Sequence, residues 1–147
     1  MTPGRSERWL KLLLRITGVV MLLAVVAFVM PRSWMVWTHR WLRMGKFPGA
    51  PIAEYLARST SGLYATLGGL MLLTASDVRR YAPVVSFLAG ALAAKSLLGL
   101  AFGLWMGMPL YWLVGDLVSA CGFAVVVLVL QFLVARSCRA GLGDQRS

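Results

Sequence analysis

Long apolar stretches divide this chain, and four of them are long enough to cross the hydrocarbon core of a membrane. A spanning helix needs about 20 mostly apolar residues. The four stretches cover residues 9–30, 59–75, 82–105 and 109–134. Only 14% of the 147 residues are charged, whereas a soluble domain carries about 25%. The sequence therefore predicts an all-α fold, a four-helix transmembrane bundle that forms a single integral membrane domain over residues 1–147.

The first stretch can also be read as a signal peptide, because basic residues precede an uninterrupted apolar run at 16–30. No Ala-x-Ala pattern closes this run. The side chains of Lys11 and Arg15 can reach back to the headgroups and so lengthen the span. We expect the segment to remain as the first span, with cleavage as the alternative.

The basic residues predict the orientation, since cytoplasmic loops of membrane proteins are enriched in Lys and Arg. With both termini inside, the cytoplasmic side holds Arg5, Arg8, Lys11, Arg15, Arg79, Arg80, Arg136, Arg139 and Arg146. The other side then holds the smaller set Arg32, Arg40, Arg43, Lys46 and Arg58. We expect a multi-pass protein of the cell inner membrane with both termini in the cytoplasm. The reversed orientation remains open because the loop after the first span is itself basic.

The net charge of +10 raises the question of a nucleic-acid partner. The basic residues flank apolar stretches, where positive charge meets anionic lipid headgroups. We therefore expect membrane lipids with anionic headgroups as partners and no nucleic acid. A second copy of the chain or another membrane subunit is a further partner that the pattern allows.

Residues 32–46 are predicted to form an amphipathic helix that lies in the interface. The apolar side carries Trp34, Trp37 and Trp41, and the polar side carries His39, Arg40, Arg43 and Lys46. Trp opposite Lys and Arg is the composition of a helix in the headgroup plane. The simplest interpretation is a membrane anchor. The alternatives are recognition of a particular anionic lipid or acidic partner, and a lid packed over the bundle.

Small residues recur at helical spacing and predict where the helices pack, because helices in membranes associate through close backbone approach. In the second span Gly62, Thr66 and Gly69 share one face with Ser59. In the third span Gly99, Gly103 and Gly107 recur at every fourth position. We expect both faces to be used mainly within one chain.

Lys95 and Asp116 are the ionisable residues that lie well inside apolar stretches. An antiparallel hairpin centred near Gly107 brings their side chains within reach of each other, so we expect a salt bridge that points into the bundle. One interpretation is a structural clamp that fixes the pairing of two helices. The other is a polar pocket for a headgroup, a small polar ligand or a proton. Near the start of the second span, Glu54 and Arg58 are spaced to pair if that segment is helical.

The sequence gives little support for catalysis. His39 is the only histidine, so one chain cannot form a bis-histidine haem site, and no Cys or His spacing fits a metal site. No phosphate loop, dinucleotide fingerprint or nucleophile elbow is present. We expect no cofactor, no metal and no catalytic residue, and we interpret Cys121 and Cys138 as free thiols.

The stretch from Arg58 through Gly62-Leu-Tyr to Gly69, followed by Asp77-Val-Arg-Arg-Tyr, resembles uncharacterised small bacterial four-helix membrane proteins. The resemblance extends over about 16–100 and includes the tryptophan-rich segment at 34–41. More loosely, the chain is similar to DoxX-like families in architecture and in the Arg58 and Gly62-Leu-Tyr pattern. The closer resemblance implies that Glu54, Arg58 and Tyr64 form a polar site, and it implies no activity. The looser one implies a membrane subunit of a quinone-linked oxidoreductase.

These observations predict a non-catalytic membrane protein that interacts with lipids or serves as an accessory subunit. The first alternative is a protein that handles protons or a solute through Lys95 and Asp116. The second is the oxidoreductase subunit that the DoxX-like similarity implies.

Overall fold

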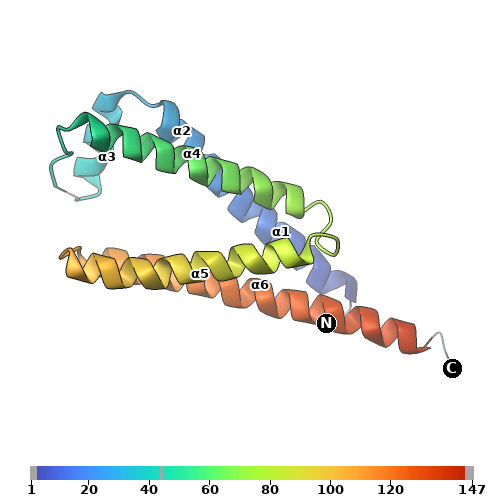
Figure 1. Cartoon of the computed structure of the whole chain (residues 1–147). Helices are drawn as coiled ribbons and strands as arrows, with labels where there is room; N and C mark the ends of the chain where they lie inside the picture. Colours follow the sequence, from blue (N-terminus) through green and yellow to red (C-terminus); the bar gives the residue numbers. More distant parts are fainter. Residues whose placement is uncertain (1–2, 44, 145–147) are drawn as a thin grey trace. The chain divides into compact units, whose positions relative to one another are not determined.

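A computed structural model describes the backbone of residues 3–43 and 45–144 and the side chains of residues 4–43 and 45–136. All regular structure in these residues is helical: α1 (Pro3–Leu22), α2 (Ala24–Val29), α3 (Arg32–Trp41), α4 (Pro51–Thr74), α5 (Ala82–Trp105) and α6 (Leu110–Asp144) (Figure 1). The all-α prediction is confirmed for this part of the chain. Arg139 and Arg146, which entered the orientation argument, have side chains outside the described residues.

Within the described residues, three helical stretches are long and apolar enough to cross a membrane by length and composition: Gly4–Val29, Ala82–Trp105 and Leu110–Arg136. These correspond to the first, third and fourth predicted spans, and they indicate a membrane protein. The predicted second span falls within α4, which is not among the three. Helix α4 is 24 residues long, but its first half carries Glu54, Arg58 and the hydroxyl residues at 59–61, which lower its mean hydropathy.

The chain divides into two compact units. One contains the residues up to Leu13 and those from Thr74 onward, and the other contains Leu14–Leu73. Helix α1 therefore contributes its beginning to the first unit and its remainder to the second.

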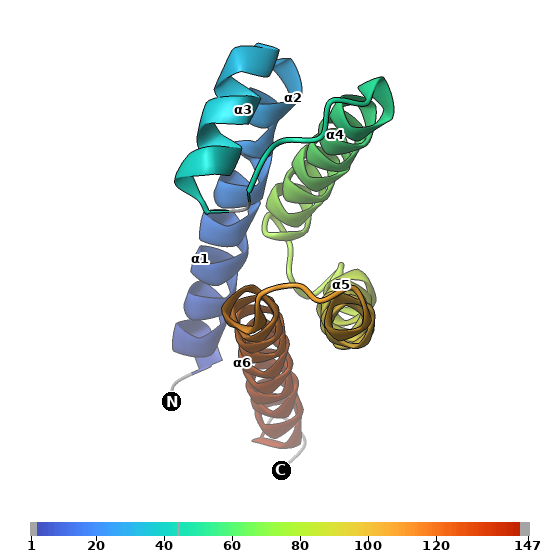
Figure 2. The same ribbon diagram turned by 90° about the vertical axis from the view of Figure 1, so that its left-hand side faces the viewer.

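In the first unit, α5 and α6 form an antiparallel hairpin and lie side by side in both views (Figures 1 and 2). The buried residues of α5 include Val85, Ala89, Ser96 and Gly103, spaced four or seven positions apart, which is the pattern of one helix face. The buried residues of α6 include Ala124, Val127 and Val134 at similar spacing. The spacing shows that the two long apolar helices meet along one defined face.

The hairpin turn is a glycine-capped helix end. The N–H of Met108 bonds the carbonyl of Gly103 at 2.9 Å, and the N–H of Gly107 bonds that of Leu104 at 3.1 Å. Gly107 has a φ of +71°, which a glycine adopts without steric cost. Pro109 then begins the approach to α6. Gly107, predicted as a packing residue, therefore serves the turn.

In the second unit, α1 and α4 cross at two glycines. A Cβ atom placed on Gly68 would lie 2.6 Å from the backbone oxygen of Gly18 and 2.6 Å from the backbone nitrogen of Leu22. Such a separation is shorter than any real contact, so the crossing requires a residue without a side chain. The α1–α4 contact is thus a backbone-to-backbone approach.

Helix α3 is shorter than the predicted 32–46, because it ends at Trp41. Arg43 has a φ of 58° and Gly45 a φ of 86°, and left-handed backbone conformations of this kind do not continue an α-helix. Arg43 and Lys46 consequently lie in the loop after the helix. Pro31 precedes α3, and Met30 is extended, so the chain turns sharply between α2 and α3.

Candidate functional site

The Lys95–Asp116 salt bridge is confirmed. Nζ of Lys95 lies 3.1 Å from Oδ1 and 3.0 Å from Oδ2 of Asp116, so the ammonium group bonds both carboxylate oxygens. The hydroxyl of Ser96, next to Lys95 on α5, donates to Oδ2 at 2.7 Å. Ser119 donates to the backbone oxygen of Asp116 at 3.0 Å. We call Lys95, Ser96, Asp116 and Ser119 the hairpin polar cluster.

Burial differs sharply within the hairpin polar cluster. Ser96 is 1% exposed, whereas the side chains of Lys95 and Asp116 are 50% and 48% exposed. The serine faces α6 in the interior of the hairpin, and the charged pair lies at the edge of the α5–α6 contact. The expectation that the pair points into the bundle is therefore not met by the hairpin, which leaves half of each charged side chain accessible.

An open hollow of about 500 Å³ adjoins Asp116. Its lining comes from α6: Tyr111, Trp112, Gly115, Asp116 and Ser119. Nε1 of Trp112 is buried and has no hydrogen-bond partner among the described residues. Asp116 and Ser119 thus border one hollow with an indole and a phenol ring. It does not include Glu54 or Arg58, which belong to the other compact unit.

A second polar contact in the same hairpin was missed by sequence reasoning. Gln131 of α6 accepts a hydrogen bond from Ser86 at 2.6 Å and donates one to the backbone oxygen of Ala82 at 2.9 Å. Both side-chain ends of the amide are therefore satisfied between the two helices. The sequence does carry a signal for this contact, since a glutamine inside an apolar stretch requires a hydrogen-bond partner.

Glu54 and Arg58 pair as expected, and Arg58 does more than pair. Its Nη2 lies 2.8 Å from Oε1 of Glu54, while its Nη1 and Nη2 donate to the backbone oxygens of Phe28 and Met30 at 2.6 and 3.0 Å. The last carbonyls of a helix have no partner within the helix. Arg58 therefore caps the end of α2 from α4.

Arg32 completes this group from the start of α3. Its Nη1 lies 3.8 Å from Oε2 of Glu54, and its Nη2 donates to the backbone oxygen of Gly49 at 3.3 Å. Tyr64, which the family resemblance associated with Glu54 and Arg58, lies ten residues beyond Glu54 on α4, about 15 Å along the helix axis. The structure thus brings Glu54 together with two arginines, and it places Tyr64 elsewhere on the same helix.

The tryptophans of α3 point outward. Trp34, Trp37 and Trp41 are 60%, 67% and 71% exposed, and the rings of Trp37 and Trp41 are stacked with centroids 6.4 Å apart. A neighbouring side of the helix is packed: Met35 is buried and, with Thr38, His39 and Leu42, lines a hollow of about 170 Å³ shared with α2 and α4. His39, expected among the basic side chains, instead contacts Phe47 edge-on at this hollow. Arg40, Arg43 and Lys46 are exposed.

The predicted packing residues divide into two groups. A Cβ atom on Gly62 would contact the ring of Phe28 at 3.3 Å, and one on Gly103 would overlap the end of the Leu113 side chain. At Gly69 and Gly99, by contrast, no described atom outside the adjacent residues and backbone of the same helix lies within 4 Å of the position that a Cβ would occupy. Thr66 bonds back to the carbonyl of Gly62 in its own helix at 2.9 Å.

The crossing residues Gly18 and Gly68 were missed, because the Gly68-Gly69 pair does not reveal from sequence which glycine faces a neighbour.

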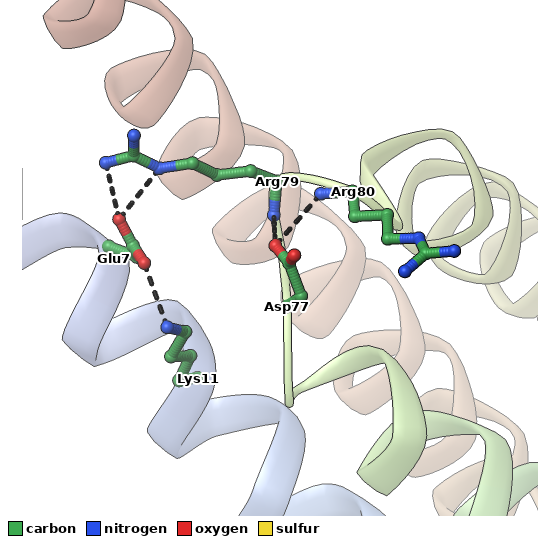
Figure 3. Close-up of polar contacts among 5 residues, drawn as sticks. All are labelled: Glu7, Lys11, Asp77, Arg79 and Arg80. Carbon is green, nitrogen blue, oxygen red and sulfur yellow. Dashed lines mark hydrogen bonds and ion pairs between the residues drawn. The ribbon is translucent and has the colours of Figure 1, made fainter.

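A further ionic group ties the start of α1 to the segment before α5 (Figure 3). Oε2 of Glu7 accepts from Arg79 at 2.7 Å, and Oε1 contacts Lys11 at 2.9 Å. Oδ1 of Asp77 accepts from the backbone N–H groups of Arg79 and Arg80, which fixes the turn that presents Arg79. The pairing of Glu7 with Arg79 could not be predicted from the sequence, because the two residues are 72 positions apart.

Comparison of the chain with known protein families, with curated proteins and with solved structures gives no match. The similarity to small four-helix membrane proteins and to DoxX-like families therefore stays a prediction.

Proposed function

We propose that this chain is a multi-pass inner-membrane protein that binds anionic phospholipid headgroups through α3 and the loop that follows it. In this proposal α4 is the second span of a four-helix bundle, both termini lie in the cytoplasm, and α3 lies in the interface on the outer side. The protein is non-catalytic and acts as a lipid-interacting or accessory subunit.

The outward tryptophans of α3 carry this proposal. Three large aromatic side chains that are each more than half exposed would be unfavourable in water, whereas the interface between headgroups and acyl chains suits the indole ring. Arg40, Arg43 and Lys46 are exposed beside them. Cations near an anionic membrane surface contribute about 1 kcal/mol each to binding. Aromatic anchoring and positive charge therefore occur in one short segment.

The assignment of α4 as a span rests on its packing. Its backbone contact with α1 at Gly18 and Gly68 is of the kind that joins helices in lipid. Arg58 and Glu54 lie at the first turns of α4, where they bond each other and the end of α2. The two charged residues that lower the hydropathy of α4 are therefore bonded within the protein, and Ser61 donates to the carbonyl of Ala57 in its own helix.

A lipid titration tests the headgroup proposal. The purified protein is titrated in mild detergent with phosphatidylglycerol or with phosphatidylcholine, and bound lipid is counted by native mass spectrometry. We expect the wild type to prefer phosphatidylglycerol. The triple variant R40Q/R43Q/K46Q should bind it roughly 100-fold more weakly, as three contributions of about 1 kcal/mol imply.

The matched control is R5Q/R8Q/R80Q, which removes the same charge at exposed sites elsewhere. The control should retain the preference for phosphatidylglycerol. Equal losses in both variants, or no preference in the wild type, would show that binding depends on net charge alone and would remove the role of α3.

A second function is favoured by the hollow beside Asp116: handling of protons or of a small polar solute. The hollow reaches a carboxylate that is half accessible and bonded to an ammonium group and a hydroxyl. The test is proton or solute flux in proteoliposomes. Wild-type flux that is lost in D116N supports this function, and wild-type vesicles no leakier than protein-free ones exclude proton handling.

A further inference from the structure

The exposed ion pair of the hairpin is unusual for its position. Lys95 lies ten residues before Trp105, and Asp116 six residues after Leu110, so the pair is about 9 to 15 Å from the hairpin turn. The hydrocarbon core is about 30 Å thick. Charged side chains at this depth are expensive unless protein covers them. The half of each side chain that the hairpin leaves accessible therefore calls for a covering surface.

The face around this pair permits close approach by another helix. On α6, Gly115, Ser119 and Gly122 follow one another at four and three positions and are all exposed. Apart from the adjacent residues and backbone of α6 itself, no described atom lies within 4 Å of a Cβ position on Gly115 or Gly122. Gly115 and Ser119 also border the hollow of about 500 Å³, together with Tyr111, Trp112 and Asp116. A neighbouring helix therefore meets small residues along 115–122 of α6, while Tyr111 and Trp112 lie at the turn end of the same hollow.

The charges indicate which neighbour fits. Nζ of Lys95 and the carboxylate of Asp116 are in contact, so a positive and a negative charge lie side by side at one depth. Rotation by two-fold symmetry about the membrane normal places each charge opposite its complement in a second copy of the same face. Another helix would cover the pair only through hydroxyl or carbonyl groups or a rare intramembrane charge, whereas a second copy supplies both complementary charges at the same depth by symmetry alone.

We infer that two copies of this chain associate through the Lys95–Asp116 side of the α5–α6 hairpin, with Lys95 of each copy bonded to Asp116 of both. The partner's ammonium group covers the accessible side of the carboxylate, and Ser119 lies near the two-fold axis. The inference adds a homodimer contact to the proposed lipid binding, and it requires only that the hairpin spans the membrane.

A charge-exchange experiment tests the contact between copies. Two differently tagged chains are expressed together, extracted in mild detergent, and purified through one tag while the other is detected. We expect wild-type chains to co-purify, and the single variants K95D and D116K each to lose at least tenfold of this signal. Co-expression of K95D with D116K should restore it, because the two faces are then complementary.

The double variant K95D/D116K is the control that restores the pair within one chain, and it should associate like the wild type. If K95D and D116K stay apart when co-expressed while the double variant behaves like the wild type, the pair acts only within a chain and the inference is wrong. Wild-type chains that do not co-purify would equally overturn it, and would mean that something other than a second copy covers this face.

A cross-linking experiment keeps the charges intact and so does not depend on variants that fold poorly. In a background with Cys121 and Cys138 replaced by Ser, S119C is oxidised in intact membranes and disulfide-linked dimers are measured. The control V114C is exposed on the same helix but points about 140° away. We expect efficient dimers from S119C and at least tenfold fewer from V114C. Equal yields, or no dimer from S119C, would contradict the contact.

Discussion

Arg58 donates hydrogen bonds in two directions, to Glu54 on its own helix and to the backbone oxygens of Phe28 and Met30 at the end of α2. Each carbonyl oxygen is one that the helix itself cannot satisfy. A residue that bonds two carbonyls and a carboxylate acts on the geometry of two segments at once. We therefore expect the loss of Arg58 to destabilise the second unit as a whole.

The first prediction concerns Arg58. Arg58→Ala should lower the free energy of unfolding by about 2 kcal/mol, the range for hydrogen bonds to charged groups. Arg58→Lys should recover only part of this, because an ammonium group cannot reproduce the planar donor fork. The measurement is unfolding in mixed micelles by added SDS, followed by circular dichroism. The control Arg40→Ala, at an exposed site, should leave the midpoint unchanged, and an unaffected R58A midpoint would show that the cap adds no stability.

The second prediction separates stability from lipid binding at Arg43. This residue has a φ of 58°, which costs a non-glycine residue roughly 1–2 kcal/mol. Arg43→Gly should therefore raise the unfolding midpoint in the same assay while it weakens phosphatidylglycerol binding through the lost charge. Arg40→Gln is the comparison, with weaker binding and no gain in stability. A destabilised R43G would mean that the Arg43 side chain contributes more to the fold than its backbone strain costs.

At the scale of helices, the α1–α4 crossing depends on which of two adjacent glycines is replaced. A methyl group on Gly68 would overlap backbone atoms of Gly18 and Leu22, which cannot move aside as a side-chain end can. We expect Gly68→Ala to destabilise the protein by about 1–3 kcal/mol, as overpacking does. Gly69→Ala, with open space around it, should be neutral or slightly stabilising. SDS unfolding of the two variants side by side provides the measurement, and equal midpoints would contradict the crossing.

These two glycines also show which features of helix packing cannot be predicted from the sequence. Local sequence patterns predict both bounds of α5 and place the start of α6 within one residue. They succeed because a long apolar run flanked by turn residues defines a helix by itself. They also predict the Lys95–Asp116 bond, because the short turn at Gly107 fixes the register of the hairpin. The register of α1 against α4 is set by no such turn. It follows from contacts between segments far apart in sequence, so the pattern favours Gly69 where Gly68 makes the contact.

The end of α3 and the start of α4 could not be predicted for a different reason. A proline such as Pro51 is typical of a helix break, yet it stands at the first position of α4, where its missing N–H is no loss. The end of α3 at Trp41 follows from the left-handed backbone at Arg43, a conformation that arginine rarely adopts. A residue in an uncommon backbone state gives no signal in the sequence.

At the scale of the whole molecule, the number of spans decides where the chain ends lie. With α4 as a span the chain crosses the membrane four times and both termini share one side. With only the three apolar stretches as spans the termini lie on opposite sides. We expect both termini in the cytoplasm, from the distribution of Lys and Arg.

Epitope tags at the two ends of the chain check this last prediction. In right-side-out spheroplasts neither tag should be cleaved by added protease, and both should be cleaved after the membrane is opened. A tag in the loop at 43–50 is the control and should be cleaved in intact spheroplasts. Cleavage of one terminal tag alone would mean that α4 does not cross the membrane.

The bond between Arg58 and Met30 spans 28 positions of sequence, and this separation has a consequence for biosynthesis. When the first span leaves the ribosome, the carbonyls at its end have no partner, because the guanidinium group that bonds them has not been translated. At 5–20 residues per second the delay is about one to six seconds. During that interval the nascent chain depends on water or the insertion machinery at this point, so the first span and α4 are expected to settle as a pair rather than one after the other.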